Sequence, residues 1–358
     1  MVPSTTHPDA QPPELDLPAL RDWLRAQGLA SGEPRVQRVS GGRTHVTFLL
    51  DVDDHEWVLR RPLPGHVTPR AHGVAFEYRV LSALAGGPVP VPRPVALCTD
   101  PTVTGAPFLL TERVPGLVVR TRADLARLSP TERRTVALAM VDVLADLHTV
   151  DPDAVGLGDL ARGDGHLGRY LRRLGQQLDR HRSRAVPGID VLRVRLAGSV
   201  PAPSASPARH GIVHGDYRLD NLVLDDATLA VRAVLDWELA TVGDPLADVG
   251  LLLAATEGVT ASTGSAVVGN GFGLAAAPGF PPADELAQRY AARTGLDERD
   301  LAALRWATAC GYFRIAVALE ELRTSGEPGR RPDADLVRGV VEAGLTTLDQ
   351  MGARQPRE

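Results

Sequence analysis

Residues 212–250 read IVHGDYRLDNLVLDDATLAVRAVLDWELATVGDPLADVG, and this stretch decides the fold. A short apolar run at 222–224 leads to a turn that contains two aspartates, and a second apolar run follows at 231–235. Apolar runs of this length on either side of a turn predict two short β-strands with polar residues at their ends. We therefore expect a hairpin whose mouth carries the chemistry of the chain.

Polar side chains stand at the ends of these runs with a regular spacing. His214 and Asp216 follow the apolar pair that opens the stretch, Asn221 comes five residues after the aspartate, and Asp236 closes the second run. The catalytic loop of protein kinases has the form H-R-D-x-x-x-x-N, with a metal-binding aspartate farther on. Phosphoryl transfer needs a carboxylate that orients the hydroxyl, and oxygen ligands that hold Mg²⁺ against the phosphates. The spacing indicates this chemistry more specifically than a single His-x-Asp, which is more often a turn.

The chain resembles the aminoglycoside phosphotransferase family of small-molecule kinases. The motifs that carry the resemblance are HGDYRLDN at 214–221, VLDWELATVGDPLADVG at 234–250 and VLRRPLPG at 58–65, and they are most similar to the branch fused to some acyl-CoA dehydrogenases. The resemblance covers residues 41–326. It implies a bilobal, protein-kinase-like α+β fold, with a small lobe of antiparallel strands and a larger, mainly helical lobe.

The resemblance also implies a role for each polar residue of the segment. Asp216 is expected to orient the acceptor hydroxyl and take its proton, while Asn221 and Asp236 hold Mg²⁺. Arg218 matches a position where protein kinases often carry a phosphate-contacting lysine, so it is assigned to the γ-phosphate. His214 is expected to brace the loop rather than transfer protons. The phosphoryl donor would be ATP or GTP.

A Ser-Gly-Gly turn in the small lobe is the expected lid over the nucleotide. Gly41 and Gly42 lie between two predicted strands, where glycine lets the backbone approach phosphates. An ordinary hairpin turn is the alternative, and alone it would be the better interpretation. Family members often carry Ser-Asn after these glycines, whereas this chain has Thr44 and His45. Because of this difference, the sequence does not decide which contacts the glycine turn makes with the nucleotide.

The chain contains no lysine, so any role that kinases give to lysine must fall to arginine. Arg60 matches the strand lysine that pairs with phosphates and with a helix glutamate, and Glu77 on a predicted helix at 71–85 is its expected partner. Arginine offers a planar, permanently charged fork for carboxylate and phosphate together. The alternative is two separate surface charges of little energetic value. The backbone at Glu112 and Val114 is the expected hinge that binds the nucleotide base.

Helical spacing of apolar residues predicts α-helices in most of the remaining chain. His148 lies on the apolar face of one predicted helix and is read as a satisfied core histidine. Asp244 is read as an N-cap, and Asp248 as a tether between its helix and the catalytic loop. The Pro-rich stretch 86–95 predicts an extended loop, and 260–282 a flexible insertion. The predicted helices are 15–28, 71–85, 129–148, 167–181, 283–294, 297–322 and 333–351, and a further helix is predicted to begin at Pro245.

Whole-chain properties restrict the function classes. The 358 residues carry a formal charge of −5, which gives no basic field for nucleic acid. No apolar run is long enough to span a bilayer, no signal peptide is evident, and the two cysteines lie far apart, so we expect a cytoplasmic protein without a membrane partner. The expected divisions are a disordered tail at 1–14, a nucleotide-binding lobe at 15–112 and a catalytic and substrate-binding lobe at 113–352. The sequence leaves the oligomeric state open.

Three alternatives to a metabolic small-molecule kinase remain open at this stage. The acceptor could be an antibiotic of the aminoglycoside or macrolide type, although the resemblance favours a metabolite such as a hydroxyacyl-CoA-like compound. A nucleotide-binding pseudokinase would explain the altered glycine turn and the missing lysine. A purely structural partner protein is the third alternative. The presence of the base and both metal ligands argues against the last two.

Overall fold

The structure is a computed structural model that describes residues 15–39, 45–63, 73–257, 277–325 and 332–352. The chain divides into two units, which are Met1–Ala85 with Pro92–Val114, and Gly86–Val91 with Pro115–Glu358. The sequence-based division into domains at residue 112 stays a prediction. The predicted tail, both glycines of the predicted lid and most of the predicted insertion lie outside the described residues.

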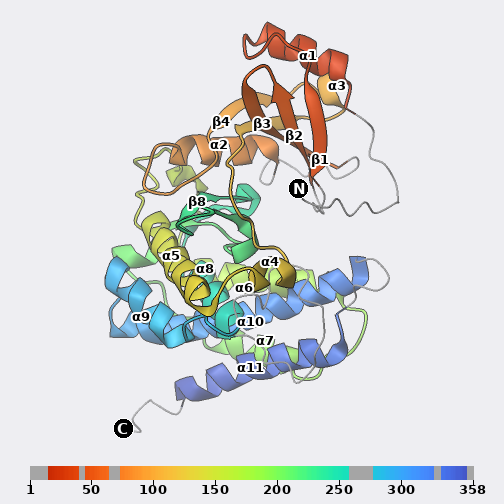
Figure 1. Ribbon diagram of the computed structural model, residues 1–358. Coiled ribbons are helices and arrows are strands. Elements are labelled where there is room, and N and C mark those ends of the chain that lie inside the picture. Colours follow the sequence, from red (N-terminus) through yellow and green to blue (C-terminus); the bar gives the residue numbers. More distant parts are fainter. Residues whose placement is uncertain (1–14, 40–44, 64–72, 258–276, 326–331, 353–358) are drawn as a thin grey trace. The chain divides into compact units, whose positions relative to one another are not determined.

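A five-stranded antiparallel sheet forms the first unit (Figure 1). Its strand order is β1-β2-β3-β5-β4, so β3 lies in the middle and carries Arg60. Side chains along β2 alternate between buried and more exposed positions over most of its length, as expected for a strand with one face against a core. The strands are β1 (Arg35–Val39), β2 (His45–Val52), β3 (His55–Pro62), β4 (Pro94–Cys98) and β5 (Phe108–Glu112).

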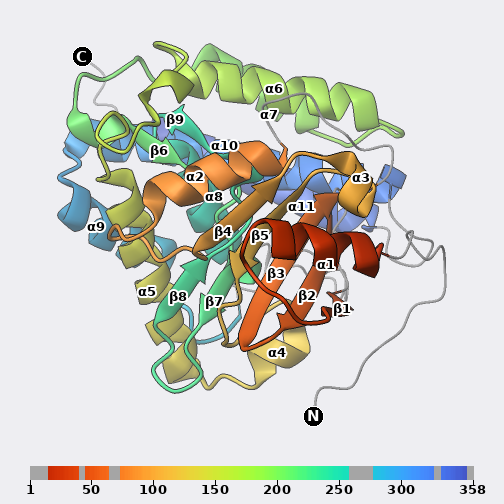
Figure 2. The same cartoon turned by 90° about the horizontal axis from the view of Figure 1, so that it is seen from above.

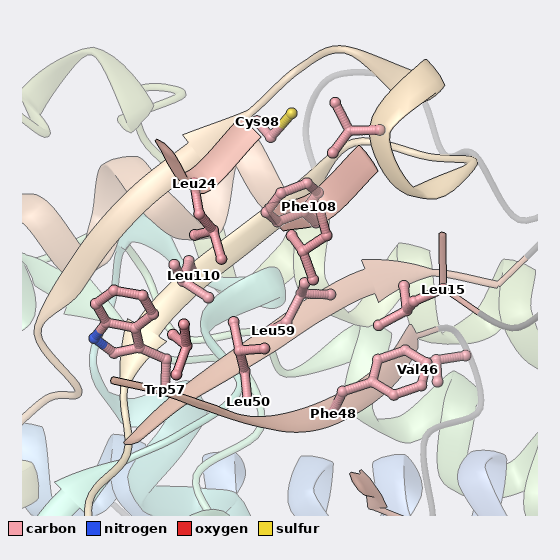
Figure 3. Close-up of a cluster of buried hydrophobic side chains, with 13 residues drawn as sticks. Leu15, Leu24, Val46, Phe48, Leu50, Trp57, Leu59, Cys98, Phe108 and Leu110 are labelled. Atoms are coloured by element: carbon pink, nitrogen blue, oxygen red, sulfur yellow. The ribbon is translucent and has the colours of Figure 1, made fainter. Parts of the chain in front are cut away.

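One hydrophobic cluster joins this sheet to helix α1 (Leu17–Ala26) (Figure 3). The ring of Trp23 meets Phe108 edge-on, with centroids 4.9 Å apart. Full burial of a large apolar side chain contributes about 1.5–3 kcal/mol, so this cluster fixes the position of the strands. The cluster includes Leu15, Leu24, Val46, Phe48, Leu50, Trp57, Leu59, Cys98, Phe108 and Leu110.

Helix α2 (Val74–Leu84) packs on β4 and β5 of the same sheet. It is shorter than the predicted helix at 71–85, of which residues 71 and 72 lie outside the described part. Val80, Leu81 and Leu84 are buried, and Glu77 is buried with them at 4% exposure. A buried carboxylate on this face needs a partner from the sheet.

The second unit is mainly helical, with two small antiparallel sheets (Figure 1). Strand β6 (Gly211–Val213) pairs with β9 (Thr241–Gly243), and β7 (Leu222–Leu224) pairs with β8 (Val231–Val234), which confirms the predicted hairpin. The helices are α4 (Arg122–Ala126), α5 (Pro130–His148), α6 (His166–His181), α7 (Ile189–Gly198), α8 (Leu246–Glu257), α9 (Ala283–Thr294), α10 (Glu298–Ser325) and α11 (Ala334–Gly352).

Helix α10 packs against α6, α8 and α11, and α6 lies beside α7 (Figure 2). Gly250 and Gly311 let α8 and α10 approach closely, because a Cβ atom on Gly250 would lie 2.2 Å from the carbonyl oxygen of Ala307. No helix in the described part of the chain is long and apolar enough to cross a membrane.

The predicted helix starts are confirmed where capping residues marked them. Ser129 and Glu132 form the reciprocal hydrogen bonds of a capping box at the start of α5, and Asp244 accepts a hydrogen bond from the N–H of Leu246 ahead of α8. Two predictions differ from the structure. The stretch 86–95 was expected to be a loop, yet β4 begins at Pro94, because an edge strand tolerates proline. Helix α7 was not predicted.

Candidate active site

A loop between β6 and β7 carries most of the predicted catalytic residues. Asp248 in α8 anchors it: the carboxylate accepts hydrogen bonds from the N–H groups of His214 at 2.6 Å and Gly215 at 2.8 Å. The Nε2 atom of His148 lies 3.3 Å from the same carboxylate, and its Nδ1 atom lies 2.7 Å from the hydroxyl of Tyr290. This confirms that Asp248 tethers the helix to the loop and that His148 is a satisfied core histidine.

Asp248 remains ionised although it is fully buried. Burial alone would raise its pKa, but the hydrogen bond with His148 and the N–H of Gly215 together lower it below the ordinary value. A carboxylate that accepts several N–H groups stabilises the loop only in this charged form. The backbone of the catalytic loop is therefore fixed by a buried negative charge.

His214 connects the loop to the end of the second strand of the hairpin. Its Nδ1 atom accepts the N–H of Asp216 at 3.2 Å, and its Nε2 atom lies 2.9 Å from the carbonyl oxygen of Leu235. These partners require the proton on Nε2, so the ring is a neutral tautomer with both nitrogens engaged by the backbone. Gly215 must be glycine here, because its φ is +85° and a Cβ atom would lie 2.7 Å from the carbonyl oxygen of Leu239.

Asn221 and Asp236 are brought to the same place by backbone contacts. The Nδ2 group of Asn221 donates to the carbonyl oxygen of Asp216 at 2.9 Å, and the N–H of Leu235 donates to the carbonyl oxygen of Asn221 at 2.8 Å. Asp236 follows directly in the left-handed region, with φ +68° and ψ +61°. A non-glycine residue there costs about 1–3 kcal/mol and persists only where the surroundings impose it, often at functional sites.

The carboxylate of Asp216 lies between two guanidinium groups. Arg218 lies 3.1 Å from Oδ2, and Arg314 donates to Oδ1 at 3.0 Å. Arg218 also lies 3.4 Å from Asp220, whose pKa is raised by burial against the opposing charge of Arg218. The side chains of Asp216, Arg218 and Arg314 are 12–15% exposed. A group that binds at Asp216 therefore meets a partly desolvated carboxylate flanked by positive charge.

Arg314 comes from α10, 98 residues after Asp216, and was not predicted. One signal in the sequence could have found it: Arg314 is the only charged residue between 306 and 319. A guanidinium in the middle of an apolar helical stretch needs a partner, because charge is not buried without one. The sequence does not show which carboxylate that partner is.

The predicted arginine–glutamate pair is formed in the first unit. Nη1 of Arg60 donates to Oε1 of Glu77 at 2.7 Å, and Nη2 lies 3.5 Å from Nδ1 of His45. Glu112, one of the two predicted hinge residues, forms an ion pair with Arg93 through its side chain. The hinge role of the backbone at Glu112 and Val114 stays a prediction. The Asp216 cluster belongs to the second unit.

Asn221 and Asp236 fit the donor set that Mg²⁺ prefers. The amide nitrogen of Asn221 donates to the loop, which leaves the amide oxygen as the coordinating atom. Within the described ranges, no group of three or more His, Cys, Asp or Glu side chains is placed to hold a metal ion. Mg²⁺ in kinase sites usually binds one or two carboxylates together with the phosphates of the substrate, so a dedicated protein cage is not required.

Comparison with known proteins agrees with this geometry. The family model of the phosphotransferase enzyme family matches residues 35–307, which is most of the chain. The chain belongs to the phosphotransferase enzyme family. The chain is 33% identical over 288 residues to acyl-CoA dehydrogenase family member 11 of Gallus gallus, and the match covers 80% of the chain and 36% of that protein. It is 34% identical over 220 residues to acyl-CoA dehydrogenase family member 10 of Mus musculus, covering 62% of the chain and 20% of that protein. The phosphotransferase thus spans about a third or less of the length of these relatives.

Solved structures give the same family and fold. A provisionally assigned aminoglycoside phosphotransferase from Ralstonia eutropha matches with a TM-score of 0.76 and 31% identity, over 94% of this phosphotransferase and 99% of that chain. A thermostable mutant of aminoglycoside phosphotransferase APH(4)-Ia, in a ternary complex with AMP-PNP and hygromycin B, matches with a TM-score of 0.59 at 17% identity, over 92% and 98% of the two chains. The second likeness concerns the fold alone. Both confirm the predicted α+β, protein-kinase-like fold class.

Proposed function

We propose that this phosphotransferase transfers the γ-phosphoryl group of ATP or GTP to a hydroxyl group of a small molecule. One observation carries the proposal: the loop that holds Asp216 also brings Asn221 next to Asp216 and to the residue before Asp236. A base and two oxygen ligands at this spacing are the parts that phosphoryl transfer to an alcohol requires. Structures of aminoglycoside phosphotransferases with AMP-PNP or ADP support a nucleotide donor.

In this mechanism Asp216 accepts the hydrogen bond of the acceptor hydroxyl and takes its proton as the oxygen attacks phosphorus. The transition state of phosphoryl transfer is loose, so orientation of the hydroxyl contributes at least as much as basicity. Arg314 and Arg218 fix the two carboxylate oxygens, which limits the rotation of the base. Arg218 also reaches the transferred γ-phosphoryl group, and His214 holds the loop through its two backbone contacts.

The remaining parts of the site neutralise phosphate charge. Mg²⁺, held by Asn221 and Asp236 when it is bound, supplies charge neutralisation on the phosphates. Arg60, oriented by Glu77, takes the phosphate-binding role of the missing lysine, and its planar fork can bind carboxylate and phosphate together. We assign nucleotide binding to the first unit, including the backbone at Glu112 and Val114, and acceptor binding to the second.

The acceptor is proposed to be a metabolite, and a hydroxyacyl-CoA-like compound is the specific candidate. The supporting observation is the similarity to acyl-CoA dehydrogenase family members 10 and 11. An antibiotic acceptor is the second candidate, because the named structural neighbours are aminoglycoside phosphotransferases. A pseudokinase is disfavoured by the intact Asp216, Asn221 and Asp236. Both cysteines are free thiols, which supports a reducing compartment such as the cytoplasm.

The test is a nucleotide-consumption screen over hydroxylated metabolites, hydroxyacyl-CoAs and aminoglycosides, with ATP and GTP as donors and Mg²⁺ present or withheld. We expect acceptor-dependent turnover that requires Mg²⁺. The variant that tests the metal ligand is Asp236→Asn. It should fold, but it should bind Mg²⁺·nucleotide poorly and turn over little, because it loses a metal ligand. Wild-type turnover and nucleotide affinity in Asp236→Asn would contradict the assignment. Nucleotide binding by the wild type with no turnover on any acceptor would favour the pseudokinase.

A further inference from the structure

Arginine side chains lie around Tyr170, in the neighbourhood of Asp216. The guanidinium of Arg173 lies over the ring of Tyr170, 5.9 Å from its centroid, and both residues belong to α6. Arg314 enters from α10, which packs against α6, and interacts electrostatically with Tyr170 and Asp216. Tyr170 therefore contacts Arg173 and interacts electrostatically with Arg314, which holds the proposed base.

Positive charge exceeds negative charge at this place. Arg173 is an exposed residue of α6, but nearby protein atoms reduce its hydration and lower its pKa, and the neighbouring guanidinium groups of Arg162, Arg314 and Arg169 lower it further, while Tyr170 acts in the opposite direction. Arg169 donates to two backbone carbonyl groups rather than to a carboxylate. A group of mutually repelling guanidinium ions is unfavourable unless an anion joins it.

Three carboxylates reduce this excess without removing it. Asp216 is shared between Arg314 and Arg218, and Asp220 lies 3.4 Å from Arg218. Glu321 lies two turns farther along α10, and its negative charge favours the charged form of Arg314. Its carboxylate also accepts a hydrogen bond from Gln177. Arg173 makes neither a hydrogen bond nor an ion pair with any residue that the structure describes.

Hydrogen-bond donors are left over at the same place. The Nε atom of Arg314 is buried and has no hydrogen-bond partner within the described part of the chain. Burial raises the pKa of Tyr170, so its hydroxyl stays protonated and can donate. An unused N–H of a buried guanidinium costs free energy until an acceptor arrives. Carboxylate and phosphate oxygens are the strongest acceptors for such donors.

The geometry points to an anion-binding subsite beside Asp216, formed by Arg173, Arg314 and Tyr170, that takes a carboxylate or phosphate group of the acceptor. This inference rests on the proposed function, because the subsite selects acceptors only if Asp216 is the base. The anion would lie close to the reacting hydroxyl, since Arg314 contacts both the base and the subsite. Hydroxycarboxylates and phosphorylated polyols meet this requirement, whereas a polycationic aminoglycoside would face like charge.

Binding of small probes to the full chain tests the subsite. Malate and glycerol 3-phosphate serve as the anionic probes, with glycerol as the uncharged and hygromycin B as the cationic comparison, all titrated calorimetrically in the presence of saturating Mg²⁺·AMP-PNP. We expect the better anion to bind at least about tenfold more tightly than glycerol or hygromycin B. The ratio between malate and glycerol 3-phosphate identifies the group as carboxylate or phosphate.

Three variants assign the binding to the subsite. Arg314→Gln and Arg173→Gln should each weaken the anionic probe about tenfold. Arg172→Gln, a neighbouring exposed arginine of α6 that forms no ion pair with a described residue, should leave probe binding unchanged. Hygromycin B binding more tightly than both anions, or anion binding that neither substitution weakens, would overturn the subsite. If Mg²⁺·AMP-PNP itself fails to bind, the proposed function is wrong, and the two failures are thus distinguishable.

Discussion

Asp216 and Arg60 are both charged groups assigned to phosphoryl transfer, yet the protein holds them in different ways. Asp216 lies on a loop whose backbone is bound to a buried carboxylate, a histidine ring and an asparagine, and its side chain is held by two arginines. Arg60 lies in the middle strand of a sheet and pairs with Glu77 from the adjacent helix. A loop needs a network to fix one side chain, whereas a strand already has a fixed direction.

This difference predicts how far each substitution should spread. Removal of one member of the loop network should change the position of several groups, because Asp248 holds the N–H of His214, the His214 ring accepts the N–H of Asp216, and the Asn221 side chain donates to the carbonyl of Asp216. Removal of Arg60 or Glu77 should affect only their joint contact, because the sheet keeps its geometry through backbone hydrogen bonds and the core. The following predictions test that contrast.

The largest effect is expected at Asp216. Asp216→Asn keeps the size of the side chain but loses the charge, so kcat should fall by at least about 10²-fold, within the range of general-base contributions. Nucleotide affinity should stay within a few-fold, because this carboxylate is assigned to the acceptor hydroxyl and not to the metal. Turnover and nucleotide binding are measured on one preparation, with the exposed turn variant Asp226→Asn as control. A parallel loss of nucleotide affinity would make Asp216 a metal ligand, and unchanged turnover would refute the kinase interpretation of the loop.

A smaller effect on catalysis, with a loss of stability, is expected at Asp248. Asp248→Asn cannot accept both N–H groups of His214 and Gly215 with the same geometry, so one buried donor loses its partner at a cost of about 1–3 kcal/mol in the free energy of unfolding. Displacement of the loop should lower kcat, since a shift of about 1 Å can cost about 10²-fold. Denaturant unfolding and turnover of the same preparation measure both effects.

The pH dependence of this loss has a definite sign. The pKa of Asp248 is lower in the folded protein than its ordinary value, so the carboxylate stabilises the fold fully above the unfolded pKa of about 3.9. The contribution disappears as the pH falls through the lowered folded pKa. The stability difference between wild type and Asp248→Asn should be constant above about pH 5 and shrink below about pH 4. A difference that grows on acidification would contradict the charged form of Asp248.

The sequence predicted the loop well because its contacts are local. The hairpin, the anchor at Asp248 and the positions of His214 and Asn221 depend on residues within one continuous segment of about forty positions. Apolar runs, a turn and an aspartate at the end of a strand can be recognised in the sequence alone. The same holds for the capping box of α5, where Ser129 and Glu132 are three residues apart.

What the sequence could not show depends on distant packing. Arg314 reaches Asp216 only because α10 packs beside α8 in the second unit. Gly250 and Gly311 permit this close packing, but the sequence does not show which residues of the two helices face each other. Helix α7 lay outside the sequence prediction, and its β-branched residues Ile189, Val191 and Val194 favour strand over helix, while burial follows Ile189, Leu192 and Leu196 at helical spacing. Tertiary contacts override such local preferences.

The smallest and most local effect is expected for Arg60 and Glu77. Arg60→Ala should weaken nucleotide binding because it removes a phosphate-binding cation, and Glu77→Ala should act through the same contact because it releases that cation. The pair is 17% and 5% exposed, so its charges are poorly screened and their coupling should lie within about 0.5–3 kcal/mol.

A double-mutant cycle on nucleotide affinity measures that coupling, and an exposed ion pair provides the control. Arg182 and Asp190 lie 2.6 Å apart but are 35% and 61% exposed, so their cycle on stability should give about 0.2–1 kcal/mol and no effect on nucleotide affinity. If Arg60 and Glu77 act as one unit, the double variant should bind nucleotide about as weakly as Arg60→Ala alone. Additive losses would mean that each residue affects the nucleotide independently. They would contradict the statement that Arg60 and Glu77 act only through their joint contact.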